Sequence, residues 1–234
     1  MINEETIPAN ESAKIKEVFA SIQGEGPYIG TKQLFVRFCE CNLRCRYCDT
    51  DFTGEAEEYT PNELAEVIKQ FGLRNIHSIS LTGGEPLLSV DFLEKFLPIL
   101  KNNYLKVYLE TNATLPEELA RVIDYIDYVS ADIKLESATG MNNSFEKHDK
   151  FFAISNKTEH FAKIVFDSNI TEDEINNCVA LAKKYDIPLI LQPKMNGDVM
   201  SITSVVAVEI MEKFLKLYPK VRLVPQVHKF LSVR

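Results

Sequence analysis

Short apolar runs alternate with polar, helix-forming segments along most of the chain, and this alternation restricts the folds that the chain can adopt. The runs have the composition of strands. Thr60 and Thr171 each open a capping box at the start of a helical segment, and Ser89 could cap a third helix. We expect strands at residues 34–38, 78–82, 106–110, 128–132, 161–166, 188–192 and 221–225.

A strand–helix–strand order at this spacing predicts βαβ units around a mostly parallel sheet, which places the chain in the α/β class. Six or seven strands are too few for a complete eight-stranded barrel. We therefore expect a partial (β/α)6-type barrel. The 234 residues show no repeat, low-complexity tract or linker that would divide them, so we expect a single domain over residues 1–234.

Composition and charge narrow the function classes. The hydrophobic content of 45% and the charged content of 26% are typical of a soluble globular protein. No apolar run is long enough to span a membrane, and the polar first residues lack the features of a secretory signal. We therefore expect a cytoplasmic protein with no membrane partner. The net charge of −8 argues against nucleic acid as the main partner but allows a small anionic ligand.

Unusual residues follow the expected strands at the point where each strand ends. In βα folds the carboxyl ends of the strands open on one face, and ligands bind at that face. Residues that are far apart in the sequence should therefore meet around one binding site. The segments concerned are 41–48, 82–86, 110–112, 132–134, 192–194 and 226–229.

Four of the five cysteines lie within ten residues of one another. Cys41, Cys45 and Cys48 have the spacing C-x3-C-x2-C, which can hold three corners of a cubane iron–sulfur cluster and leave the fourth iron open. A reducing cytoplasm disfavours a disulfide knot, and a structural zinc site usually takes four ligands in two distant pairs. The spacing favours the cluster and leaves zinc open as the second reading. We expect Cys178 to be a buried apolar residue and Cys39 not to be a ligand.

The motif CNLRCRYC, the aromatic Tyr47 within it and the later segment TGGEP together resemble the radical S-adenosylmethionine (SAM) superfamily. The resemblance implies a [4Fe-4S] cluster whose open iron binds the amine and carboxylate of SAM. Reduction of this cluster cleaves SAM and gives a 5′-deoxyadenosyl radical. Gly83 and Gly84 would permit close backbone approach, and a strand-end carbonyl or Glu85 would accept a hydrogen bond from the SAM amine.

Further motifs, spread over most of the chain, are similar to those of the 7-carboxy-7-deazaguanine synthases. They are SIQGEGP, FVRF, CDT, ETN, DIK, LQP and QVHK. This resemblance implies a homodimer that converts 6-carboxy-5,6,7,8-tetrahydropterin to 7-carboxy-7-deazaguanine and releases ammonia, in queuosine, archaeosine or other deazapurine biosynthesis. It also implies catalytic use of SAM, assistance by Mg²⁺, and a flavodoxin-like or other reductant.

The same resemblance assigns roles to individual residues. No acid or base is assigned, because the radical performs the reaction. The metal ligands would be Cys41, Cys45 and Cys48 for the cluster and Thr50 for Mg²⁺. Substrate contacts are expected from Ile22, Gln23, Gly24, Glu25, Arg37, Thr82 and His228. The SAM site is expected to include Tyr47, Asp49, Gly84, Glu85, Ser130, Lys134 and Gln192.

Several of these residues also have a purely structural interpretation. Arg37 lies in an apolar strand and needs an anionic partner, which could be the substrate carboxylate or an internal one. Asp49 and Thr50 could supply oxygen ligands to Mg²⁺ or could cap the following segment. Gln23 could read the edge of a pterin or belong only to a glycine-rich turn, and His228 could bind substrate or be merely exposed.

Two other functions remain open from the sequence. A radical SAM activase, which makes a glycyl radical in a partner protein, has a similar length and the same cysteine spacing. Such an activase would not need Gln23 or Arg37 as contacts for a small molecule. A non-enzymatic iron–sulfur or zinc module would leave the convergence of strand-end residues unexplained.

Overall fold

The computed structural model describes residues 12–48 and 55–233, and its centre is a nine-stranded sheet in the order β11-β8-β7-β6-β5-β4-β2-β1-β3. All seven expected strands are present, and their ends lie within two residues of the predicted ends. They pair in parallel throughout, as predicted. They are β2 (Lys32–Phe38), β4 (Ile79–Gly83), β5 (Val107–Thr111), β6 (Tyr128–Asp132), β7 (Glu159–Phe166), β8 (Leu189–Pro193) and β11 (Val221–Leu223).

Two further strands extend the sheet at one edge and were not predicted. β1 (Ala13–Ile22) pairs antiparallel with β2, and β3 (Glu57–Tyr59) pairs antiparallel with β1. The pairing of β1 shifts register between Ile15 and Glu17, which interrupts the alternation of buried and exposed side chains. A strand without regular alternation resembles a polar loop in the sequence. A short hairpin of β9 (Met195–Asn196) and β10 (Val199–Met200) follows β8.

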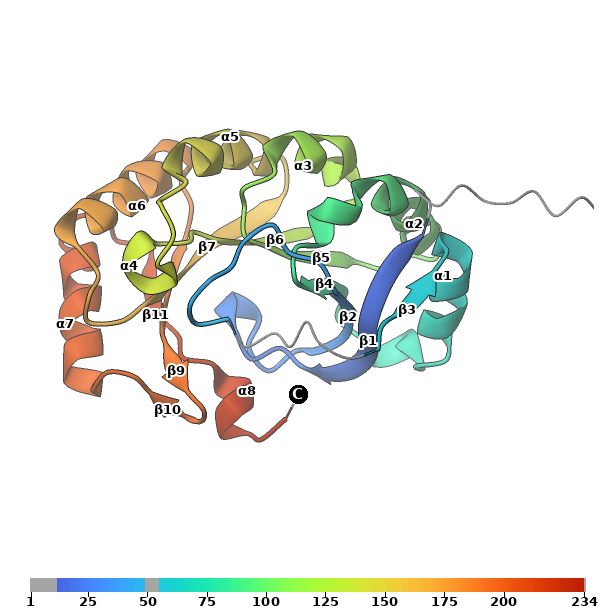
Figure 1. Cartoon of the computed structure of the whole chain (residues 1–234), viewed down its shortest axis with the longest axis horizontal. Helices are drawn as coiled ribbons and strands as arrows, with labels where there is room; N and C mark the ends of the chain where they lie inside the picture. The colour runs from blue at the N-terminus through green and yellow to red at the C-terminus, as the bar shows by residue number, and fades with distance from the viewer. Residues whose placement is uncertain (1–11, 49–54, 234) are drawn as a thin grey trace, which may run out of the picture.

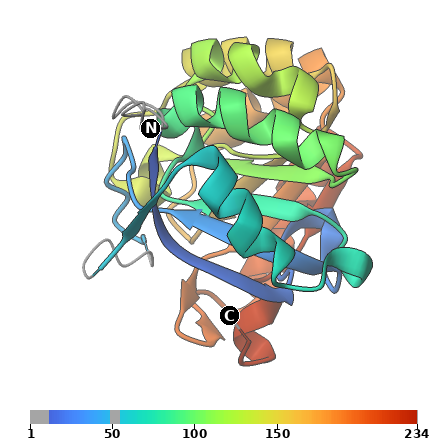
Figure 2. The ribbon, with the colours of Figure 1, turned by 90° about the vertical axis from the view of Figure 1, so that its right-hand side faces the viewer.

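Helices cover the outer, convex face of the curved sheet, so the chain forms the expected partial barrel (Figures 1 and 2). Both predicted capping boxes are present, at Thr60 with Glu63 and at Thr171 with Glu174. Ser89 precedes α2 as predicted, but its side chain makes no capping hydrogen bond. The main helices are α1 (Pro61–Lys69), α2 (Val90–Asn102), α3 (Pro116–Val122), α5 (Phe145–Ser155), α6 (Glu172–Tyr185) and α7 (Ser204–Leu215).

Shorter helical turns complete the fold. They are η2 (Gly26–Tyr28), η3 (Leu73–Asn75), η4 (Pro86–Ser89), η5 (Ile123–Tyr125), α4 (Glu136–Thr139) and α8 (Val227–Phe230). None of the helices in the described part of the chain is long and apolar enough to cross a membrane.

Apolar side chains fill the space between the sheet and its helices, and Cys178 is fully buried among them, as expected. A smaller aromatic cluster contains Tyr108, Tyr128 and Phe161. Tyr28, in the turn between β1 and β2, packs edge-on against Tyr128 with their ring centroids 4.8 Å apart. The turn that carries the QGEG motif is thereby fixed to the strands β5, β6 and β7.

Candidate active site

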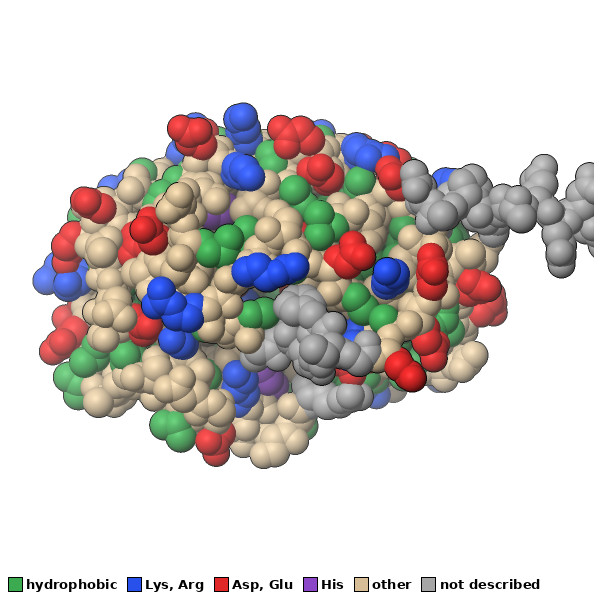
Figure 3. Space-filling view, in the orientation of Figure 1, with side chains coloured by type: hydrophobic (Ala, Val, Ile, Leu, Met, Phe, Trp, Pro, Cys, Tyr) green, Lys and Arg blue, Asp and Glu red, His purple; other side chains and the backbone are tan. Residues whose placement is uncertain are grey.

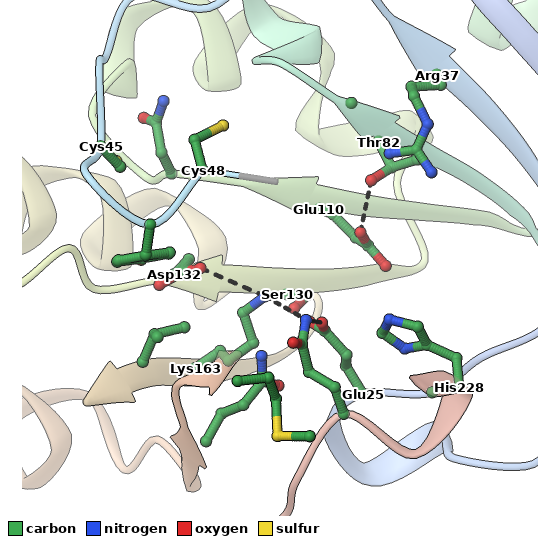
Figure 4. A pocket seen from close by; sticks show the side chains of 18 of the residues that line it. Glu25, Arg37, Cys45, Cys48, Thr82, Glu110, Ser130, Asp132, Lys163 and His228 are labelled. Carbon is green, nitrogen blue, oxygen red and sulfur yellow. Dashed lines mark hydrogen bonds and ion pairs between the residues drawn. The ribbon is translucent and has the colours of Figure 1, made fainter. Parts of the chain in front are cut away.

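A cavity of about 570 Å³ lies where the parallel strands end, and nearly all of the predicted site residues line it. Its walls come from the β1–β2 turn, the cysteine loop after β2, the ends of β4 to β8, and the segment around α8 (Figure 4). Such a volume is within the usual range for sites that bind small molecules. The predicted residues in its lining are Ile22, Gln23, Gly24, Glu25, Arg37, Cys41, Cys45, Tyr47, Cys48, Thr82, Gly84, Ser130, Lys134, Gln192 and His228.

Three predicted site residues are not part of this lining. Asp49 and Thr50 lie outside the described residues. Glu85 is described, but its side chain is buried beneath the strand ends and does not line the cavity.

Cys41, Cys45 and Cys48 lie on one loop at the mouth of the cavity, whereas Cys39 faces a separate, smaller cavity. Cys41 and Cys45 are half-buried and Cys48 is exposed. Burial raises the pKa of the Cys41 and Cys45 thiols. Within the described ranges, no three His, Cys, Asp or Glu side chains converge on one point that could hold a single metal ion. Three thiols on one loop that line the same cavity suit the three-thiolate set of a cubane cluster.

The two glycines of the TGGEP segment allow the cysteine loop to start directly against the end of β4. Gly83 has φ +114°, a conformation that other residues rarely adopt. A Cβ atom on Gly84 would lie only 1.9 Å from the carbonyl oxygen of Glu40. The backbone N–H of Gly84 donates to Phe38 O at 3.0 Å, and that of Glu85 donates to Glu40 O at 2.6 Å. The close approach that was predicted is therefore an approach to the cysteine loop.

The Glu85 carboxylate has a different role from the predicted one. It accepts hydrogen bonds from the backbone N–H groups of Leu87 (3.1 Å) and Asn112 (2.7 Å) and from Thr111 Oγ1 (2.9 Å). Burial outweighs these bonds and raises the pKa of Glu85 to about 7. The carboxylate ties the glycine turn to the end of β5, and the alternative acceptor for the SAM amine, a strand-end carbonyl, does not depend on this side chain.

Glu110, which lies in one of the segments expected at the site but was given no individual role, organises one wall of the cavity. Its two carboxylate oxygens accept from Thr82 Oγ1 at 2.6 Å and from Gln23 Nε2 at 2.9 Å. The same Gln23 nitrogen also donates to Gln33, and Gln23 Oε1 accepts from the backbone of Glu25. Gln23 is therefore part of a fixed hydrogen-bond network, and Glu110 is the acidic group that this network presents to the cavity.

Arg37 has the internal partner that one of its two interpretations requires, and it also lines the cavity. Its Nε donates to Glu17 Oε1 at 2.8 Å, so an internal ion pair is present. Its guanidinium also lies 5.5 Å from the centre of the Phe19 ring and lines the cavity. The ion pair with Glu17 is made through Nε alone. The two Nη groups have the geometry to bind both oxygens of a ligand carboxylate.

A chain of ion pairs crosses the floor of the cavity (Figure 4). Lys163 Nζ lies 2.5 Å from Glu25 Oε2 and 3.3 Å from Asp132 Oδ2. Lys134 Nζ lies 2.7 Å from the same Asp132 oxygen and 3.0 Å from the Tyr47 hydroxyl. Burial opposes the charge on Glu25, but Lys163 and Gln226 outweigh it and lower the pKa of Glu25 to about 2.

Lys163 and Asp132 were missed as individual site residues. The sequence signal for Lys163 is a single lysine within the apolar run FAKIVF, and Asp132 ends the strand before Lys134. A buried lysine needs a carboxylate partner. A lysine inside an apolar run therefore indicates a buried ion pair at this position.

The segment around α8 closes the cavity over the QGEG turn. The backbone N–H of Val227 donates to Gly24 O at 2.9 Å, and Gln226 Nε2 donates to Glu25 Oε1 at 2.6 Å. A Cβ atom on Gly24 would lie 2.3 Å from His228 Nδ1, so glycine is needed here for α8 to pack. His228 is thereby placed in the lining of the cavity.

Two buried oxygen atoms in the cavity lining, Asp132 Oδ1 and Gln192 Oε1, have no hydrogen-bond partner within the described part of the chain. Buried acceptors usually have partners, so these two indicate a ligand that brings donor groups. Three thiols, a buried lysine and two such acceptors suit an iron–sulfur cluster together with a zwitterionic ligand such as SAM.

Comparisons with a family model, with curated proteins and with solved structures all point to the same group of proteins. The family model described as "Radical SAM superfamily" matches residues 36–197. A 7-carboxy-7-deazaguanine synthase of Geobacter sulfurreducens is 39% identical, with 94% of this chain and 97% of that protein covered. One from Archaeoglobus fulgidus is 37% identical, with 95% and 99% covered. The crystal structure of QueE from Escherichia coli shares the fold, with a TM-score of 0.65 at 19% identity over 93% of this chain and 95% of that one.

Proposed function

The chain belongs to the radical SAM superfamily and, within it, to the 7-carboxy-7-deazaguanine synthases, and we propose on this premise that it converts 6-carboxy-5,6,7,8-tetrahydropterin to 7-carboxy-7-deazaguanine and ammonia. Its cofactors are those of the family, a [4Fe-4S] cluster and SAM. When bound, these cofactors supply the radical chemistry that starts the ring contraction. The substrate is a small molecule and not a nucleic acid.

The observation that supports this function most strongly is that one cavity joins the cysteine loop to a wall of fixed polar groups. We assign the cluster to Cys41, Cys45 and Cys48 at its mouth. The SAM site lies beside them, where the Lys134 ammonium suits a carboxylate and the Gln192 and Asp132 acceptors suit hydroxyl or amine donors. Tyr47, Gly84 and Ser130 complete this part of the lining.

The substrate lies at the other end of the cavity in this proposal. Arg37 would bind the substrate carboxylate through its Nη groups, while Glu17 holds Nε in place. Glu110 would accept from the N–H groups of the pterin, with Gln23 and Thr82 holding its two oxygens. Ile22, Gly24 and His228 would form the remaining contacts, whereas Glu25 would act through Lys163 and Gln226.

Further parts of the proposal concern Mg²⁺ and the other partners. Thr50, with Asp49 beside it, would supply oxygen ligands to Mg²⁺. Turnover should then rise when Mg²⁺ is added to chelated enzyme, and Thr50→Ala should reduce this response without loss of iron. We also propose a single cytoplasmic domain that acts as a homodimer.

We propose a flavodoxin-like, acidic protein as the reductant. Although the net charge is −8, several Lys and Arg side chains lie near the centre of the face in Figure 3, with acidic side chains between them and towards the edges. Cys48, in the cluster loop, is exposed. Basic side chains on the face that carries the cysteine loop favour contact with an acidic partner.

The glycyl-radical activase is not favoured, because the relatives that match over nearly their full length are synthases. To test the proposed function, anaerobically reconstituted and reduced enzyme is incubated with SAM and the carboxylated pterin, and the product is identified by mass. A Cys41→Ala variant serves as the control without a cluster. SAM cleavage without formation of 7-carboxy-7-deazaguanine would refute the substrate and leave the superfamily assignment intact.

A further inference from the structure

We propose that Lys163 is a positioning residue, which neutralises Asp132 so that the neighbouring Lys134 can bind an anionic group of the ligand. This inference rests on the proposed function, because it takes the SAM carboxylate as that group. Lys163 itself would not contact SAM.

The geometry of three side chains supports this inference. Asp132 Oδ2 is shared by two ammonium groups, with Lys134 at 2.7 Å and Lys163 at 3.3 Å. All three side chains are largely buried, with exposed fractions of 9% for Asp132, 18% for Lys134 and 14% for Lys163. Because water contributes little screening at such a site, a buried carboxylate needs a nearby cation at all times.

The backbone fixes Lys163 beside Asp132. The two residues are partners in the parallel pairing of β6 and β7, and the N–H of Ile133 donates to Lys163 O at 2.8 Å. On its other side, Lys163 reaches Glu25, whose second oxygen accepts from Gln226. The ammonium of Lys163 is therefore held between two carboxylates, whereas Lys134 has only Asp132 as an anionic partner among the recorded ion pairs of the described residues.

The consequence for ligand binding follows from charge compensation. When an anion binds to Lys134, the attraction between Lys134 and Asp132 weakens, and Lys163 becomes the main cation for Asp132. Without Lys163, Asp132 would compete with the ligand carboxylate for Lys134. SAM would then bind more weakly, although no atom that contacts it had been removed.

The test measures the dissociation constant of SAM for anaerobically reconstituted holoenzyme by equilibrium dialysis. We expect Lys163→Met to weaken SAM binding by about tenfold or more, in the range of measured couplings between sites. Lys163→Arg keeps the positive charge and should therefore weaken SAM binding less than Lys163→Met does. The matched control is Lys101→Met, which removes the ion pair between Lys101 and Asp127 (3.0 Å), a pair outside the cavity lining. This control should leave SAM binding unchanged.

A second variant tests whether weaker SAM binding comes from competition between Asp132 and the SAM carboxylate for Lys134 or from a general loss of structure. In Asp132→Asn/Lys163→Met, the competing carboxylate is gone and an acceptor oxygen remains, so SAM binding should recover most of the loss. Iron content and the thermal midpoint of each variant verify that it is folded, and Lys163→Gln, alone and combined with Asp132→Asn, takes the place of Lys163→Met if that protein is unstable.

Wild-type affinity in Lys163→Met, or a double variant no better than Lys163→Met, would overturn the role of Lys163. If wild-type holoenzyme bound no SAM at all, the proposed function would fail together with this inference.

Discussion

Asn112, just after β5, donates a hydrogen bond from its Nδ2 to Oδ1 of Asn42 in the cysteine loop at 2.8 Å. Asn42 Nδ2 in turn donates to Thr114 Oγ1 at 2.9 Å, and Asn112 Oδ1 accepts from the backbone and side chain of Thr114. These bonds attach the loop between Cys41 and Cys45 to the segment that directly follows β5. The cysteine loop is therefore positioned by side chains other than the cysteines themselves.

Loss of this attachment should weaken the retention of the cluster by the protein. We expect Asn42→Ala to release iron to a chelator several-fold faster than wild type, since each lost hydrogen bond costs about 1 kcal/mol. The rate of iron release measures this effect. Asn169→Ala is the matched control, because Asn169 bonds to Asp167 in a turn on another part of the surface. Equal rates of iron release in Asn42→Ala and wild type would show that the loop does not depend on this contact.

The cysteines themselves should separate into two groups. Alanine at Cys41, Cys45 or Cys48 should abolish iron binding after anaerobic reconstitution, because a cubane needs each of its three thiolates. Alanine at Cys39 should preserve iron, since Cys39 faces a different cavity. Iron analysis per chain measures both outcomes. Loss of iron in Cys39→Ala with retention in Cys41→Ala would reverse the assignment of the ligands.

Arg37→Ala should weaken use of the substrate and leave SAM binding nearly unchanged. A charge-assisted pair contributes roughly 1.5–3 kcal/mol, so we expect kcat/KM for the pterin to fall about ten- to a hundredfold. Arg37→Lys should recover only part of the loss, because an ammonium cannot form the fork. Steady-state kinetics measure the effect.

Glu17→Gln distinguishes the two roles of Arg37, because it removes the internal ion pair and keeps the arginine. We expect it to lower kcat/KM much less than Arg37→Ala does. A Glu17→Gln variant as impaired as Arg37→Ala would show that the ion pair with Glu17 is the whole function of the arginine.

The ion pair between Glu25 and Lys163 should make stability depend on pH in acid. The pKa of Glu25 falls from 4.5 to about 2 on folding, because Lys163 and Gln226 outweigh the effect of burial. A lowered pKa means that the ionised form stabilises the folded state above about pH 4.5, and that this contribution disappears as the pH falls to about 2.

Glu25→Gln should therefore lower the free energy of unfolding by roughly 2–3 kcal/mol at pH 7 and by almost nothing near pH 2. Denaturant titrations of both proteins across this range measure the difference. A difference that stays constant with pH would exclude the ion pair as its source.

Much of the fold could be predicted because its signals are local. The seven parallel strands are apolar runs between polar segments, and Thr60 and Thr171 mark two helix starts within a few residues. β1 escaped prediction because the register shift between Ile15 and Glu17 removes the alternation that marks a half-buried strand. β3 has only three residues and pairs with β1 alone in the described structure, so little in its own sequence distinguishes it.

The location of the site was also predictable, because strand ends meet in any βα fold, but the direction of each side chain was not. Glu85 and Glu110 both end or follow a strand, yet Glu85 turns under the strand ends while Glu110 faces the cavity. Gly83 has a positive φ two residues before Glu85, and the sequence does not show in which direction this conformation sends the Glu85 side chain. Lys163 was missed because a single lysine in an apolar run does not show which carboxylates it will meet.

The measurement that tests the central claim most directly is product formation when SAM is limiting. Reduced holoenzyme receives an excess of 6-carboxytetrahydropterin and Mg²⁺ with SAM at a tenth of the substrate concentration, and 7-carboxy-7-deazaguanine is quantified by mass. The account predicts more product than SAM, because the resemblance to the synthases implies that SAM is used catalytically. Reductive cleavage of SAM without any 7-carboxy-7-deazaguanine would contradict the account.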